Sequence, residues 1–67
     1  MEIILNGEKE SLDKEYTVNE LLKKLDFNPE IVTVSLNGNI LPKEYFDHTL
    51  IKSGDTVDIL LFMGGGK

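Results

Sequence analysis

The chain has 67 residues, the size of one small domain, so a second independent hydrophobic core is not expected. It contains no cysteine, which excludes disulfides and thiol chemistry, and its single histidine, His48, cannot build a metal site alone. Twelve acidic residues against seven basic ones argue against nucleic-acid binding. The lack of a long apolar run or a signal peptide predicts a soluble, unsecreted protein away from membranes; the absence of cysteine fits a reducing cytoplasm, and a monomer is the default expectation.

The chain begins with the pattern of a β-hairpin. Residues 2–6 are rich in β-branched and apolar side chains, which favours a strand. Asn6-Gly7 can adopt the two positive φ angles of a tight turn. Residues 8–12 are then expected to return as the second strand.

A helix is predicted next. In Thr17-Val18-Asn19-Glu20 the Thr17 hydroxyl can accept from the Glu20 amide while the Glu20 side chain reaches back, a capping box that begins the helix at Val18. Asn28-Pro29 predicts an end near Asp26, because proline disfavours helical backbone before it. The apolar residues that recur on one helical stripe, and should pack on a sheet, are Val18, Leu21, Leu22 and Leu25.

The second half of the chain is dominated by strands. Residues 31–36 are predicted to form one strand, Asn37-Gly38 repeats the turn signal, and residues 39–41 are expected to return briefly. Lys43-Glu44-Tyr45-Phe46 suits one helical turn whose aromatic rings cover an edge of the core. Residues 56–63 alternate in hydrophobicity and give the clearest strand pattern of the chain.

This order of elements predicts an α+β fold with one helix packed across a mixed sheet of four to five strands. The predicted domain occupies residues 1–63. Residues 64–67 are expected to form a flexible tail, because Gly64, Gly65 and Gly66 have no side chains to pack. A tail of that length extends about 14 Å, enough to enter a narrow pocket of another protein.

Four segments and the terminal glycines occur in an order that covers the whole chain. The segments are Met1-Glu2-Ile3-Ile4-Leu5-Asn6-Gly7, Thr17-Val18-Asn19-Glu20-Leu21-Leu22, Val34-Ser35-Leu36-Asn37-Gly38 and Ser53-Gly54-Asp55-Thr56-Val57-Asp58-Ile59. Together they resemble the β-grasp, ubiquitin-like sulfur carriers of the ThiS and MoaD group, with the thiamin-biosynthesis branch closest.

The resemblance implies a carrier that binds no cofactor and catalyses nothing itself. A ubiquitin-activating-type adenylyltransferase would use ATP to adenylate the carboxylate of Gly66, which follows Gly65, and a persulfide sulfur donor would convert it to a thiocarboxylate. Thiazole synthase would then receive the sulfur for thiamin biosynthesis. The alternatives are a MoaD-like carrier for molybdopterin synthesis, a ubiquitin-like modifier attached to lysines, and a binding domain without covalent chemistry.

Lys67 departs from the family pattern, which ends in Gly-Gly. Its presence blocks the carboxylate of Gly66. Three explanations remain open: a peptidase removes Lys67, the residue is a cloning or sequence-assignment feature, or this chain never forms a thiocarboxylate.

A candidate docking patch lies in the last strand, where Leu60 and Phe62 occupy the face that is polar in a half-exposed strand. If exposed, the two side chains would seat the activating enzyme close to the tail. The alternative is that the loop around Tyr45 and Phe46 covers them.

Other titratable residues are interpreted as solvated. His48 has no nucleophile or carboxylate placed around it by any motif, so it is expected to be an ordinary loop histidine. The acidic residues of the first hairpin and of the segment that follows it should form a solvent-exposed edge, without the clustered oxygen ligands of a metal site. These residues are Glu8, Glu10, Asp13 and Glu15.

Overall fold

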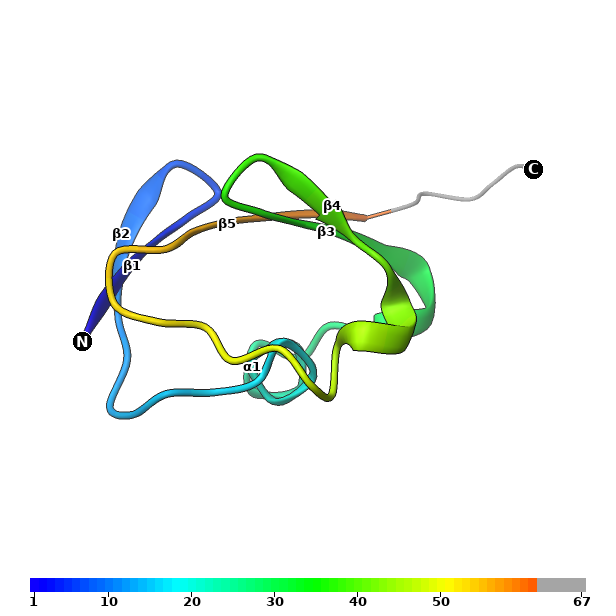
Figure 1. Ribbon diagram of the computed structural model, residues 1–67, viewed down its shortest axis with the longest axis horizontal. Helices are drawn as coiled ribbons and strands as arrows, with labels where there is room; N and C mark the ends of the chain where they lie inside the picture. Colours follow the sequence, from blue (N-terminus) through cyan, green and yellow to red (C-terminus); the bar gives the residue numbers. More distant parts are fainter. Residues whose placement is uncertain (62–67) are drawn as a thin grey trace.

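The computed structural model describes residues 1–61, which form a five-stranded sheet with α1 lying across one face (Figure 1). The predicted α+β arrangement is confirmed. Among these residues, no helix is long and apolar enough to cross a membrane. The elements in chain order are β1 Glu2–Leu5, β2 Glu8–Ser11, α1 Val18–Lys24, the 3-10 turn η1 Pro29–Ile31, β3 Val32–Leu36, β4 Asn39–Leu41, the 3-10 turn η2 Lys43–Tyr45 and β5 Thr56–Leu61.

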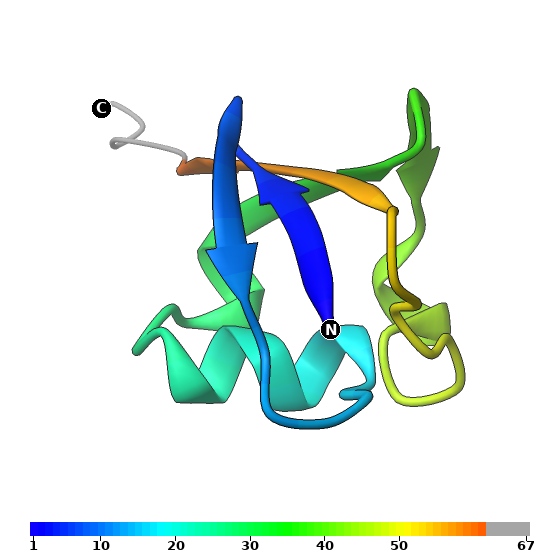
Figure 2. The same ribbon diagram turned by 90° about the vertical axis from the view of Figure 1, so that its left-hand side faces the viewer.

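The last strand in the sequence lies at the centre of the sheet. The spatial order is β2-β1-β5-β3-β4, with β1 parallel to β5 and all other neighbours antiparallel. A parallel pair requires a long crossover connection, and here that connection includes α1. Figure 2 shows α1 crossing beneath the hairpin of β1 and β2.

Both ends of α1 are fixed by local hydrogen bonds. At the start, Thr17 Oγ1 accepts from the Glu20 amide at 3.1 Å and Glu20 Oε1 accepts from the Thr17 amide at 2.9 Å, which confirms the capping box. At the end, Asp26 adopts a φ of 65°, and the Phe27 amide donates to the Leu22 carbonyl at 2.8 Å. This Schellman arrangement ends the helix at Lys24, earlier than predicted. Pro29 instead begins η1.

One core fills the space between α1 and the sheet. Phe46 belongs to it with 4% of its surface exposed, but its neighbour Tyr45 is 51% exposed, so the prediction that both aromatics cover the core is wrong for Tyr45. Leu25 is only partly buried, because the helix has ended there. The buried apolar residues are Ile3, Leu12, Val18, Leu21, Leu22, Val32, Val34, Phe46, Ile51, Val57 and Ile59.

The two Asn-Gly pairs form the predicted tight turns. Asn6 and Gly7 have φ angles of 50° and 84°, and Asn37 and Gly38 have 52° and 87°. Two consecutive positive values define type I′ turns, whose twist matches that of the strands they join. The pairings Leu5 with Glu8 and Leu36 with Asn39 confirm two-residue loops.

Each turn asparagine also binds the central strand. Asn6 Oδ1 accepts from the amide of Ile59 at 2.7 Å, which continues the ladder along β5 beyond the end of β1. On the other side, Asn37 Oδ1 accepts from the amide of Thr56 at 2.9 Å, and Asn37 Nδ2 donates to Asp55 Oδ1. The side chains of both turns therefore fix β5 from its two flanks.

Asn6 adopts a positive φ in the turn and accepts a hydrogen bond from the Ile59 amide, and two substitutions should separate these roles. Asn6→Gly removes the acceptor for the Ile59 amide and should lower the free energy of unfolding by about 1–2 kcal/mol. Asn6→Ala should cost about 1 kcal/mol more, because alanine is strained at positive φ. Urea denaturation followed by far-UV circular dichroism measures both, with the exposed Asn39→Ala as control. Equal stability of Asn6→Gly and the unsubstituted chain would contradict the hydrogen-bond role.

Candidate functional site

The candidate interaction surface is the sheet face turned away from α1, which we call the outer face. It consists of the alternate residues of the three strands β3, β4 and β5, while Val57 and Ile59 point into the core. In Figure 1 this face lies above the sheet and α1 below it. The residues of the outer face on these strands are Thr33, Ser35, Ile40, Thr56, Asp58 and Leu60.

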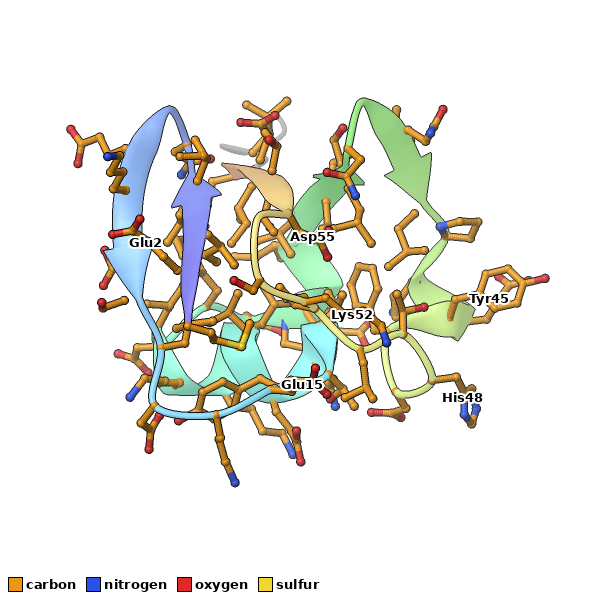
Figure 3. The ribbon with its side chains drawn as sticks, turned by 60° about the vertical axis from the view of Figure 1, so that its left-hand side comes forward. Glu2, Glu15, Tyr45, His48, Lys52 and Asp55 are labelled. Atoms are coloured by element: carbon orange, nitrogen blue, oxygen red, sulfur yellow. The ribbon has the colours of Figure 1, made fainter. Side chains whose placement is uncertain are left out.

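Two large apolar side chains of the outer face are open to solvent. Leu60 is 66% exposed and Ile40 is 71% exposed. They flank a shallow hollow over β3 and β5, and Figure 3 shows the two hairpin turns on either side of β5. The residues that line the hollow are Asn6, Thr33, Ser35, Ile40, Asp58, Ile59 and Leu60.

Leu60 is the one residue of the predicted docking patch that falls within residues 1–61. It is exposed, so the loop around Tyr45 and Phe46 does not cover it; Phe46 packs into the core instead. Phe62, Gly64, Gly65, Gly66 and Lys67 lie outside the described residues, and their predicted roles stay predictions.

Sequence reasoning singled out Leu60 alone on this surface and missed its neighbours, among them Ile40 and Asp58. The hairpin register pairs Ile40 with Ser35, and the β3–β5 register pairs Ser35 with Asp58, so the three form one row across the outer face. The place of Ile40 could have been inferred from the two-residue turn at Asn37-Gly38. Its alignment with Asp58 depends on a pairing between distant strands.

The titratable residues interpreted as solvated are indeed exposed. His48 lies in the segment after η2, and Figure 3 shows both His48 and Tyr45 pointing away from the body of the protein. The acidic residues of the first hairpin and its exit are exposed as predicted. These are Glu8, Glu10, Asp13 and Glu15.

A polar pair lies in the connection between β2 and α1. The Tyr16 hydroxyl donates a hydrogen bond to Asp13 Oδ1, and this bond holds the pKa of the Asp13 carboxyl below its ordinary value of 3.8. The same bond raises the pKa of the Tyr16 hydroxyl, because the proton is shared with an anion. Lys14 and Lys24 place their ammonium groups 5.2 and 5.6 Å from the centre of the Tyr16 ring.

Comparison with known proteins assigns the chain to a family. A family model described as the ThiS family matches residues 2–66. The chain belongs to the ThiS family. A solved ThiS structure, a thiamine biosynthesis protein from Geobacter metallireducens, is 45% identical and superposes with a TM-score of 0.87, covering 98% of this chain and 100% of its own. This likeness confirms the predicted β-grasp fold.

Two relatives of this ThiS-family chain carry informative names. The sulfur carrier protein ThiS of Escherichia coli is 27% identical over 66 residues, covering 98% of this chain and 100% of that protein. A thiazole synthase of Paramagnetospirillum magneticum is 33% identical over 67 residues, which is all of this chain but 21% of that protein's length. The chain therefore corresponds to about a fifth of that larger protein.

The Asp13–Tyr16 pair predicts a measurable pH effect. A carboxyl whose pKa is lowered by folding stabilises the folded state above its ordinary value of 3.8, and that contribution is lost as the pH falls through the lower folded pKa. Tyr16→Phe should shift the Asp13 titration upward, toward the ordinary value, and make the loss of stability in acid shallower. NMR titration of the Asp13 carboxyl carbon measures the shift.

The matched control is Tyr45→Phe, which removes a hydroxyl from an exposed tyrosine. It should leave the Asp13 titration as it is. An Asp13 titration that is the same with and without the Tyr16 hydroxyl would show that the hydrogen bond does not lower the carboxyl pKa.

Proposed function

We propose that this protein is the sulfur carrier of thiamin biosynthesis, delivering sulfur for the thiazole ring as a co-substrate of partner enzymes. The observation that carries the proposal is the match of the ThiS family model through residue 66, which includes all three terminal glycines. The 45% identity to the thiamine biosynthesis protein of Geobacter metallireducens supports it over 98% of this chain and 100% of that one.

The chemistry takes place at the carboxylate of Gly66. A C-terminal carboxylate has a pKa of about 3.5, so it is an anion at neutral pH and a poor electrophile. A ubiquitin-activating-type adenylyltransferase activates it with ATP: the carboxylate oxygen attacks the α-phosphorus and pyrophosphate leaves. The terminal sulfur of a persulfide donor then attacks the acyl carbon and AMP leaves. A thiol cleaves the resulting acyl disulfide at the donor sulfur, releasing the thiocarboxylate and leaving a disulfide.

Thiazole synthase is the proposed acceptor. The thiazole synthase of Paramagnetospirillum magneticum contains a segment similar to this entire chain, so a carrier-like part and a larger remainder share one polypeptide there. A thiazole synthase of Magnetococcus marinus shows the same relation, at 31% identity and 21% of its length. This linkage supports a working pair of carrier and synthase. Cleavage of the acyl disulfide consumes a reduced thiol, and thiols are kept reduced in the cytoplasm, so we propose a cytoplasmic location.

The site residues follow from this chemistry. We assign the acyl chemistry to Gly66. Gly64 and Gly65 are the residues that enter the active site of the partner enzyme. The domain ends at residue 63. In the printed sequence the Gly66 carbonyl is in a peptide bond to Lys67, so the assignment requires that Lys67 be removed before adenylation.

Intact mass spectrometry of the protein isolated from its host tests the proposal. We expect loss of the terminal lysine and then a gain of about 16 Da, as one oxygen of the carboxylate is replaced by sulfur. A ladder of heavier species would instead indicate a modifier conjugated to other proteins. A mass that keeps Lys67 under conditions of full thiamin synthesis would contradict the carrier function at Gly66.

The outer face is the proposed docking surface for the adenylyltransferase. Gly66 lies five residues beyond Leu61, so its carboxyl group can be at most about 18 Å from the end of β5. An enzyme that acts on Gly66 must therefore approach the end of β5, where Leu60 is 66% exposed. Exposed apolar side chains at that place are suited to contact with a protein surface.

Truncation of the patch should weaken this association. Phe62→Ala and Leu60→Ala are each expected to raise the dissociation constant for the adenylyltransferase by about 10-fold, because each removes an apolar anchor from the interface. Isothermal titration calorimetry measures the change, and far-UV circular dichroism should show an unaltered fold. Tyr45→Ala, also an exposed side chain, serves as control. Unaltered affinity in both patch variants would remove the patch from the proposal.

A further inference from the structure

Asp58 places a carboxylate in the middle of the outer face, near its two exposed apolar side chains, Leu60 and Ile40. It lies on the central strand β5, directly opposite Ser35 of β3. Leu60 follows two residues later on the same face, and Ile40 lies on the far side of Ser35. The carboxylate is thus half-buried between two exposed apolar side chains.

In the part of the chain that the structure describes, this carboxylate has neither a hydrogen-bond donor nor a cation as partner. Within residues 1–61 no group donates a hydrogen bond to the side-chain carboxylate of Asp58, and the ion pair found there joins Lys43 to Glu30. Other aspartates are used locally: Asp55 accepts from the Lys52 amide at 2.8 Å, and Asp47 accepts from Asn19 Nδ2 at 2.7 Å. Asp58 and Asp26 have no such partner within residues 1–61, and of these two Asp58 is half-buried whereas Asp26 is exposed.

A partner that covers Leu60 and Ile40 also removes water from Asp58. Burial of an unpaired carboxylate is strongly unfavourable, whereas burial against a cation that donates hydrogen bonds restores the lost interactions. The chain carries a net charge of −5, which further favours a basic partner surface. An arginine meets the requirement best, because its planar guanidinium donates two parallel hydrogen bonds to a carboxylate.

We propose that Asp58 is the specificity-determining residue of the outer face, where it pairs with an arginine set among apolar side chains on the adenylyltransferase. This inference rests on the proposed function. The adenylyltransferase is the occupant because its active site must come within reach of Gly66, as argued above. In two relatives named thiazole synthase a carrier-like segment shares the polypeptide, where covalent linkage raises the local concentration and lowers the need for such a charge pair.

The experiment compares variants of the full 67-residue chain in binding to the adenylyltransferase of the same host, by isothermal titration calorimetry. Asp58→Asn keeps the size of the side chain and removes its charge, and should raise the dissociation constant by about 10-fold or more. Asp58→Glu keeps the charge and should recover part of the affinity. Raising the salt from about 50 to 500 mM should weaken the unsubstituted chain more than Asp58→Asn, because salt screens the charge pair.

Asp26→Asn is the matched control. It removes the same charge from an exposed aspartate that follows α1, on the opposite side of the sheet, and asparagine tolerates the φ of 65° found there. We expect its affinity to stay within about 2-fold of the unsubstituted chain. Equal affinities and equal salt dependence of Asp58→Asn and Asp26→Asn would overturn the inference.

Failure of the proposed function gives a different result. A chain ending at Gly66 that neither binds the adenylyltransferase nor supports ATP–pyrophosphate exchange would refute the carrier function as well as the inference. Normal exchange by that chain, together with full affinity of Asp58→Asn, would refute only the role of Asp58.

Discussion

The central position of β5 is the constraint on which the rest of the structure depends. This strand is paired with β1 in parallel and with β3 antiparallel, and the side chains of Asn6 and Asn37 bind its backbone from both flanks. A strand bound along both edges is the hardest part of a small sheet to displace. The first part of β5 is therefore bound along both edges, whereas Leu60 and Leu61 at its end pair with β3.

The domain and the residues that follow it have different roles. In the proposed function, partner enzymes make and break every bond at Gly66, and the domain supplies recognition. The outer face is suited to that task, since Leu60 and Ile40 offer apolar contact area and Asp58 adds a single charge between them. Apolar area contributes affinity, whereas one buried charge discriminates among partners that offer similar apolar surfaces.

Part of this candidate site could be read from the sequence, and part could not. The alternation along residues 56–63 predicts that Leu60 faces away from Val57 and Ile59, and this is confirmed. The same alternation could not decide whether another segment covers Leu60, because that depends on where η2 and the chain after it pack. Phe46 and Tyr45 are adjacent aromatics, yet one lies in the core and the other in solvent.

The sequence by itself determined the local elements: the two type I′ turns at Asn-Gly, the capping box at Thr17, and the alternation of the last strand. Each depends on contacts between residues a few positions apart, so short-range stereochemistry settles it. Only the tertiary structure decided that β5 lies between β1 and β3, that Asn6 reaches an amide 53 residues away, and that Ile40, Ser35 and Asp58 align. These features follow from packing one core between the sheet and α1, which no local pattern encodes.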